Sequence, residues 1–103
     1  MSRLIPVEYD LILAAVLFSI GLYGVMVRKN GIIVLMALEI MLNAAIFNFV
    51  AFSSYFDDPS GQVFALLAIA IAASESALGL AIFLTLYRTH GTVEIDRIRF
   101  LRW

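Results

Sequence analysis

The chain has 103 residues, of which 63% are hydrophobic and 15% are charged, and its mean hydropathy is +1.00. Soluble domains have about 45–50% apolar and about 25% charged residues, so this composition predicts a single membrane domain over residues 1–103. The net charge of −1 gives no reason to expect nucleic-acid binding. The sequence has no cysteine, which excludes disulfides and iron–sulfur ligation, and its one histidine, His90, cannot form a haem-ligating pair within the chain.

Three apolar stretches are each long enough to cross a bilayer as a helix, which takes about 20 residues. They cover approximately residues 8–28, 31–53 and 61–88. We therefore predict an all-α membrane protein with three transmembrane helices and a polar tail over residues 89–103. The first stretch contains Ser19, Gly21 and Gly24, and its glycines predict close packing against another helix, with a ligand site as the alternative.

The connections carry signals for helix ends. Arg28–Gly31 is a tight turn in which Asn30 is expected to cap the second helix. In the second connection, Asp58 is expected to cap the third helix, with Pro59 in its first turn. The alternating sequence over Thr92–Ile98 predicts either an extended segment that docks on a partner or a loosely ordered tail.

The basic residues separate between the two sides of a three-span arrangement. The side with the first connection and the tail carries Arg28, Lys29, Arg88, Arg97, Arg99 and Arg102. The opposite side carries Arg3 and the acids Glu8, Asp10, Asp57 and Asp58. The positive-inside rule therefore predicts an N-terminus outside and a C-terminus that is cytoplasmic, or on the equivalent matrix or stromal side.

Two carboxylic acids lie inside the apolar stretches, Glu39 in the second and Glu75 in the third, and neither span contains a lysine or arginine to pair with them. A charge at the centre of a membrane helix costs about 2.5–3.5 kcal/mol on insertion scales. At 1.5 Å per residue, Glu39 is expected roughly 10–14 Å and Glu75 roughly 18 Å from the cytoplasmic side. Acids at this depth favour an ion or proton pathway, and the alternative is a protonated glutamate that only hydrogen-bonds to a neighbouring helix.

Helical spacing selects the neighbours of these acids. Asn43 follows Glu39 by four residues and shares its face, whereas Asn48 lies about 180° away. Ser74 and Ser76 flank Glu75 and are expected to hydrogen-bond to it or to helix carbonyls.

Small residues on the stripe of Glu75 would let another helix approach and shield the carboxyl group. They are Ala68, Ala72 and Gly79. Three helices cannot enclose both glutamates and a water-filled path, so we expect neighbouring subunits to supply the missing cation. Arg28 and Lys29 either contact the cytoplasmic mouth of that path or serve only to set the topology.

Several motifs resemble the family of small K subunits, also called chain 4L, of complex I and related quinone oxidoreductases. They are Leu17–Gly24, Arg28-Lys29-Asn30, LMALEIMLNA (Leu35–Ala44), Gly61-Gln62-Val63 and IAIAASESALGLAI (Ile69–Ile82). Together they cover nearly the whole chain, and the spacing between Glu39 and Glu75 is that of the family. Two departures are Lys29, where arginine is frequent, and the serines Ser74 and Ser76, where alanine is usual.

The resemblance implies a non-redox subunit of a proton-translocating NADH (or related donor):quinone oxidoreductase, in which Glu39 and Glu75 transfer protons. Supporting residues are Arg28, Lys29, Asn43, Ser74 and Ser76. It further implies that quinone, flavin or deazaflavin and iron–sulfur clusters belong to partner subunits, and that A-, J-, N- and H-type membrane-arm subunits surround this chain. The prokaryotic cytoplasmic membrane is the expected location, with the thylakoid and mitochondrial inner membranes open.

Other functional classes compete with this interpretation. One is a subunit of a multisubunit cation/proton antiporter, and another is a purely structural spacer in the membrane arm. A small multidrug exporter has a similar length and a membrane glutamate. It would, however, have four spans with its glutamate in the first, which differs from this sequence.

Overall fold

The structure is a computed structural model that describes residues 6–95, and this part of the chain folds into three helices. They are α1 (Val7–Val27), α2 (Gly31–Tyr55) and α3 (Ser60–His90). Each is long and apolar enough to cross a membrane, which confirms the predicted all-α fold with three spans. The bounds differ from the predicted spans by no more than two residues.

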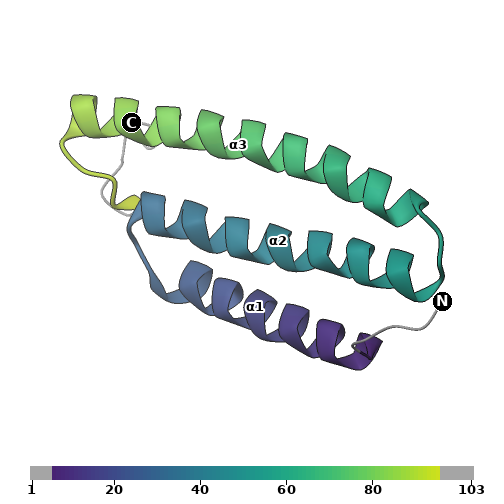
Figure 1. Ribbon diagram of the computed structural model, residues 1–103. Helices are drawn as coiled ribbons and strands as arrows, with labels where there is room; N and C mark the ends of the chain where they lie inside the picture. Colours follow the sequence, from purple (N-terminus) through teal and green to yellow (C-terminus); the bar gives the residue numbers. More distant parts are fainter. Residues whose placement is uncertain (1–5, 96–103) are drawn as a thin grey trace.

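The three helices run antiparallel to their neighbours, with α2 in the middle (Figure 1). α2 packs against both other helices, whereas α1 and α3 have no comparable contact within the described residues. One end of the layer therefore carries Arg28, Lys29 and Arg88. The other end carries the acids Glu8, Asp10, Asp57 and Asp58. Arg3, Arg97, Arg99 and Arg102 belong to the same prediction but lie outside the described residues.

The predicted glycines bring α1 close to α2. A Cβ atom on Gly21 would lie 2.5 Å from Met41 Cγ and 2.7 Å from the carbonyl oxygen of Ala37. A Cβ atom on Gly24 would lie 3.0 Å from Ala37 Cβ. These distances leave no room for a side chain at Gly21, which confirms that the glycines of the first span allow close helix packing.

Contacts at three glycines set the antiparallel register of α2 and α3. They join Gly31 to Phe83, Leu35 to Gly79, and Ser53 to Gly61. The buried residues of the layer are small, and among the hydrophobic ones every residue but Ile46 is an alanine. The large apolar side chains point outward, as expected for a protein surrounded by lipid and by other membrane helices instead of water.

Both connections are fixed by side-chain hydrogen bonds. Asn30 caps α2 as predicted, since its Oδ1 accepts from the N–H groups of Ile32 at 2.9 Å and Ile33 at 3.2 Å. At α3, Pro59 occupies the N-cap position, and Asp58 Oδ1 accepts from the Ser60 N–H at 3.0 Å. The backbone N–H and then the side chain of Ser60 lower the pKa of the Asp58 carboxyl below its ordinary value of 3.8.

The start of the tail is extended and pairs with the first connection of the same chain. Gly31 N donates to Val93 O at 2.7 Å, and Ile95 N donates to Lys29 O at 2.8 Å. An isolated antiparallel bridge joins Asn30 to Glu94 between these bonds. The predicted extended conformation is thus present up to Glu94, with the chain's own connection as its pairing partner. Residues 96–98 of that prediction lie outside the described part.

Candidate functional site

The register of α2 and α3 places the two membrane glutamates at the same level. Leu35 lies beside Gly79, and one helical turn further along α2 is Glu39, while one turn back along α3 is Glu75. Both are therefore about 12 Å from the level of Gly31, at 1.5 Å per residue.

This level arrangement corrects the expectation that Glu75 lies deeper than Glu39. That estimate was counted from the end of the third span. α3 continues beyond Phe83, which lies beside Gly31, to His90, an overhang of about 10 Å. The depth of Glu75 was therefore overestimated because the overhang was counted as part of the layer.

The two carboxyl groups lie on opposite sides of the line along which α2 and α3 touch. On α3 this line passes through Ala72, which is buried, and Gly79, which contacts α2. With about 100° between successive residues, Ser76 lies about 40–60° to one side of the line and Glu75 the same angle to the other. The stripe of small residues therefore packs against α2 of the same chain and leaves Glu75 exposed.

Glu39 opens into a groove between α2 and α3 with a volume of about 450 Å³. Its walls are Ile32, Leu35, Met36, Ile40, Ser76 and Leu80, so Glu39 and the Ser76 hydroxyl are its polar groups. Ser76 Oγ is buried and has no hydrogen-bond partner within residues 6–95. Glu75 does not line this groove. Ser76, which was expected to hydrogen-bond to Glu75 or to helix carbonyls, thus shares a groove with Glu39 of the neighbouring helix.

The flanking serine Ser74 has a different role in the structure. Its Oγ donates to the carbonyl oxygen of Ala70 at 3.0 Å, which is one of the two alternatives that the sequence suggested for these serines. The hydroxyl is exposed on α3 and takes no part in the groove.

The two asparagines of α2 lie on different faces, as their spacing predicts. Asn43 is exposed one turn from Glu39 and does not line the groove. Asn48 lines a hollow of about 440 Å³ against α1, together with Phe18 and Ser19. In the part of the chain that the structure describes, Asn48 Oδ1 is buried without a hydrogen-bond partner.

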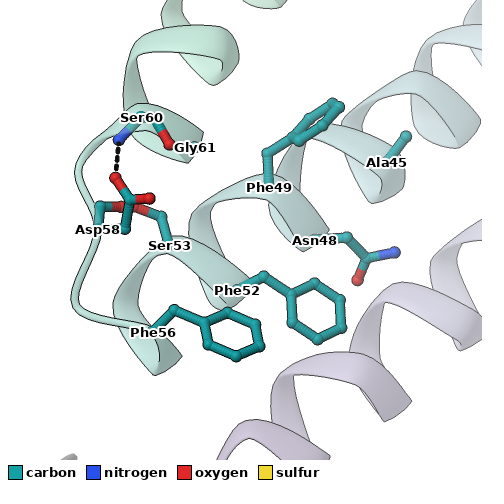
Figure 2. Close-up of a pocket in the computed structure, with 9 residues that line it drawn as sticks. All are labelled: Ala45, Asn48, Phe49, Phe52, Ser53, Phe56, Asp58, Ser60 and Gly61. Carbon is teal, nitrogen blue, oxygen red and sulfur yellow. Dashed lines mark hydrogen bonds between the residues drawn. The ribbon is translucent and has the colours of Figure 1, made fainter.

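A further pocket of about 390 Å³ lies where α2 turns into α3, and Figure 2 shows its lining. Phe49, Phe52 and Phe56 form its aromatic walls. The carboxyl group of Asp58 points to the Ser60 N–H at its edge. Neither membrane glutamate lines this pocket, and it lies at the end of the layer opposite the basic connection.

Arg28 and Lys29 are exposed on the connection between α1 and α2. Glu39 lies about 12 Å along α2 from Gly31, and Lys29 precedes the start of α2 by two residues, so the basic pair stands at the end of the layer and does not reach the carboxyl group directly. Within residues 6–95 there is no group of three or more His, Cys, Asp or Glu side chains that could hold a metal ion.

The sequence predicts only in part on which side of the α2–α3 contact each polar side chain lies. The small residues Ala72 and Gly79 could have revealed that Ser76 and Glu75 diverge, because 100° per residue separates these two side chains around the helix. The pairing of the tail with the first connection had no comparable signal, since alternation over the seven residues Thr92–Ile98 does not identify the segment that they pair with.

Comparisons with known proteins show the family of this chain. The family described as NADH-ubiquinone/plastoquinone oxidoreductase chain 4L matches residues 9–103. The chain is 49% identical over 98 residues to NADH-quinone oxidoreductase subunit K of Anaeromyxobacter sp. (strain Fw109-5), covering 95% of this chain and 98% of the relative. It is 50% identical over 101 residues to NAD(P)H-quinone oxidoreductase subunit 4L of the organellar chromatophore of Paulinella chromatophora, covering 96% and 98%.

A third relative, NAD(P)H-quinone oxidoreductase subunit 4L of Synechococcus sp. (strain JA-3-3Ab), is 45% identical over 102 residues, covering 97% of this chain and 100% of the relative. The family match thus spans α2, α3, all but the first two residues of α1, and the positions of both glutamates. This chain belongs to the family of NADH-ubiquinone/plastoquinone oxidoreductase chain 4L.

Proposed function

We propose that this chain is a non-redox membrane subunit of a complex I-type quinone oxidoreductase, and that Glu39 and Glu75 carry protons in its membrane arm. The names of its relatives support the first part, since they are subunits of NADH- or NAD(P)H-quinone oxidoreductases. The observation that carries the second part is the level position of two glutamates, about 12 Å into a layer whose membrane core is about 30 Å thick.

The opposite sides of the two carboxyl groups give the chain a specific task. Glu39 faces the groove with Ser76, and Glu75 faces outward on the other side of the α2–α3 contact. Each carboxyl group therefore meets a different neighbour, and a proton that moves between them crosses this chain from one side to the other. Ser76 is the polar side chain of α3 that we assign to the groove of Glu39, and Asn43 lies one turn from Glu39 on α2. Ser74 is exposed on α3, directly before Glu75.

The remaining parts of the reaction belong to partner subunits. The chain has no cysteine and one histidine, so we assign quinone, flavin or deazaflavin and iron–sulfur clusters to other subunits of the complex. A-, J-, N- and H-type subunits are the proposed neighbours, and they supply the cations that face Glu39 and Glu75. The chain alone thus transfers protons without changing its own oxidation state.

The proposed orientation follows from the basic residues. Arg28, Lys29 and Arg88 lie at one end of the described layer, so the positive-inside rule places this end in the cytoplasm or on its matrix or stromal equivalent. In that orientation the basic connection stands at the cytoplasmic side of the path. The proposed location is the prokaryotic cytoplasmic membrane.

The deciding experiment measures protons pumped per electron in sealed membrane vesicles that carry Glu39→Gln or Glu75→Gln in the assembled complex. Glutamine keeps the size of the side chain but cannot release a proton, so both variants are expected to lower the ratio at a given rate of quinone reduction. Glu8→Gln is the matched control, because Glu8 is exposed in the first turn of α1. Full pumping by both membrane variants would refute the proton role and leave the family membership intact.

Purification of the native assembly separates this function from its alternatives. Co-purification with quinone-reducing and iron–sulfur subunits is expected for the proposed function. Recovery with subunits of a cation/proton antiporter alone would exclude it.

A further inference from the structure

The end of α3 returns to the connection between α1 and α2 and pairs with it. Gly91 caps α3 with φ +70°, and the following residues run back to the start of α2 (Figure 1). The two bonds from Gly31 N to Val93 O and from Ile95 N to Lys29 O lie on either side of Asn30 and Glu94. Asn30 and Glu94 are thus a non-hydrogen-bonded antiparallel pair.

This pairing adds a hydrogen bond to the three-residue connection between α1 and α2, residues 28–30. The Arg28 N–H donates to Gly24 O at 3.1 Å, and Asn30 caps α2 through its side chain. The carbonyl group of Lys29, between them, accepts from Ile95 N. Each residue of the connection therefore has a hydrogen bond that holds it, and one of these bonds comes from the segment Gly91–Ile95.

We propose that Gly91–Ile95 is a strap that positions the basic connection, and with it Arg28 and Lys29, for their contact with the neighbouring subunit. The inference rests on the proposed function, in which this connection stands at the cytoplasmic side of the proton path. The strap begins at the end of α3, so it also ties the helix of Glu75 to the start of the helix of Glu39. The strap residues position the connection and do not themselves carry protons.

A cysteine pair tests whether the strap is closed in the assembled complex. The chain has no cysteine of its own, so Asn30→Cys with Glu94→Cys introduces two unique thiols. Non-hydrogen-bonded antiparallel pairs have Cα atoms about 4.5 Å apart, which is within the range of about 4.4–6.8 Å that a disulfide spans. After mild oxidation, both thiols of the double variant are expected to resist a maleimide–polyethylene glycol reagent, while each single variant remains reactive. Reactive thiols in the oxidised double variant would overturn the proposal.

Substitutions at Gly91 test the function of the strap. A Cβ atom at this position meets nothing within 4 Å, so any effect arises from the left-handed backbone and not from a clash. Asparagine adopts the left-handed conformation more readily than a β-branched residue such as valine. For Gly91→Val, the penalty of this conformation lowers the ratio of closed to open strap about 5- to 30-fold. Gly91→Val is therefore expected to lower quinone-reductase turnover of the assembled complex, and Gly91→Asn is expected to stay near the parent.

The disulfide should repair the valine variant. In a chain that combines Gly91→Val with the cysteine pair, oxidation is expected to raise turnover, and reduction is expected to lower it again. Equal turnover of the oxidised and reduced forms, with the disulfide shown to be closed, would overturn the positioning role, as would equal rates for the valine and asparagine variants.

The strap and the proton role fail in different measurements. The strap variants keep Glu39 and Glu75, so we expect turnover to fall while protons pumped per electron stay constant. If the glutamine variants lose pumping while Gly91→Val and Gly91→Asn turn over at the same rate, the positioning role of the strap alone is rejected. Redox-dependent turnover of the cysteine variant together with full pumping by both glutamine variants would reject the proton role alone.

Discussion

Replacing Ser76 with alanine separates stability from proton transfer. Ser76 Oγ is buried, has no hydrogen-bond partner among the described residues, and lies in the groove of Glu39 among apolar side chains. An unsatisfied buried hydroxyl costs about 1–3 kcal/mol, so its removal should leave the stability of the chain unchanged or raise it. If the hydroxyl donates to the Glu39 carboxyl group or to its water during transfer, the same change should slow pumping.

The expected size of the kinetic effect follows from one hydrogen bond. A neutral hydrogen bond contributes about 0.5–1.5 kcal/mol net, which corresponds to about a twofold to tenfold loss in proton transfer rate. Ser74→Ala is the matched control two residues away, because Ser74 Oγ donates to Ala70 O and does not line the groove. Ser76→Thr restores the hydroxyl and should recover part of the rate.

The assay is the initial rate of acidification in inverted vesicles, read from a pH-sensitive dye and divided by the rate of quinone reduction. Thermal unfolding of the purified complex is measured in parallel. The reasoning predicts slower pumping with equal or higher stability for Ser76→Ala and no change for Ser74→Ala. Parental pumping by Ser76→Ala, under conditions where Glu39→Gln fails to pump, would refute it and leave Ser76 as a packing residue.

Two further predictions concern the scaffold. Gly21→Val should destabilise the chain by about 1–3 kcal/mol and more than Gly24→Val, because the nearest atoms at Gly21 include a backbone oxygen of Ala37 at 2.7 Å; equal melting temperatures in detergent would contradict this. Asp58→Ala should lower helix stability above pH 3.8, since the Ser60 N–H lowers the pKa of the Asp58 carboxyl and this contribution is lost as the pH falls through the lowered value. Circular dichroism against pH checks it, and a difference from the parent that persists unchanged into strong acid would show that the charge is not responsible.

The helices and their ends could be predicted because each depends on local sequence. Apolar length alone defines three spans, and Asn30 caps α2 with its own side chain. Gly21 marks a close approach whichever helix it meets. The register between two helices depends instead on how side chains interlock across them. Gly79 fits against Leu35, and this fit, which no periodicity shows, determines that Glu39 and Glu75 are level.

The error in the depth of Glu75 has the same origin. An overhang of α3 beyond the layer cannot be seen in hydropathy, because the residues from Leu84 to Tyr87 are largely as apolar as those inside. The strap was equally hidden, since its partner lies more than sixty residues earlier in the chain. Such pairings depend on the whole fold, so they emerge only when the helices are placed.

Glu39 and Glu75 lie on opposite sides of the contact between α2 and α3, and the residues at this contact are small. Ala72 is buried and Gly79 packs against Leu35, so little side-chain volume stands where α2 and α3 touch. Ser76 lies on the Glu39 side of this contact, and Glu75 lies on the other side. In the proposed function, a proton that passes between the two carboxyl groups crosses this line of small residues, which is why we attribute the crossing to the α2–α3 contact.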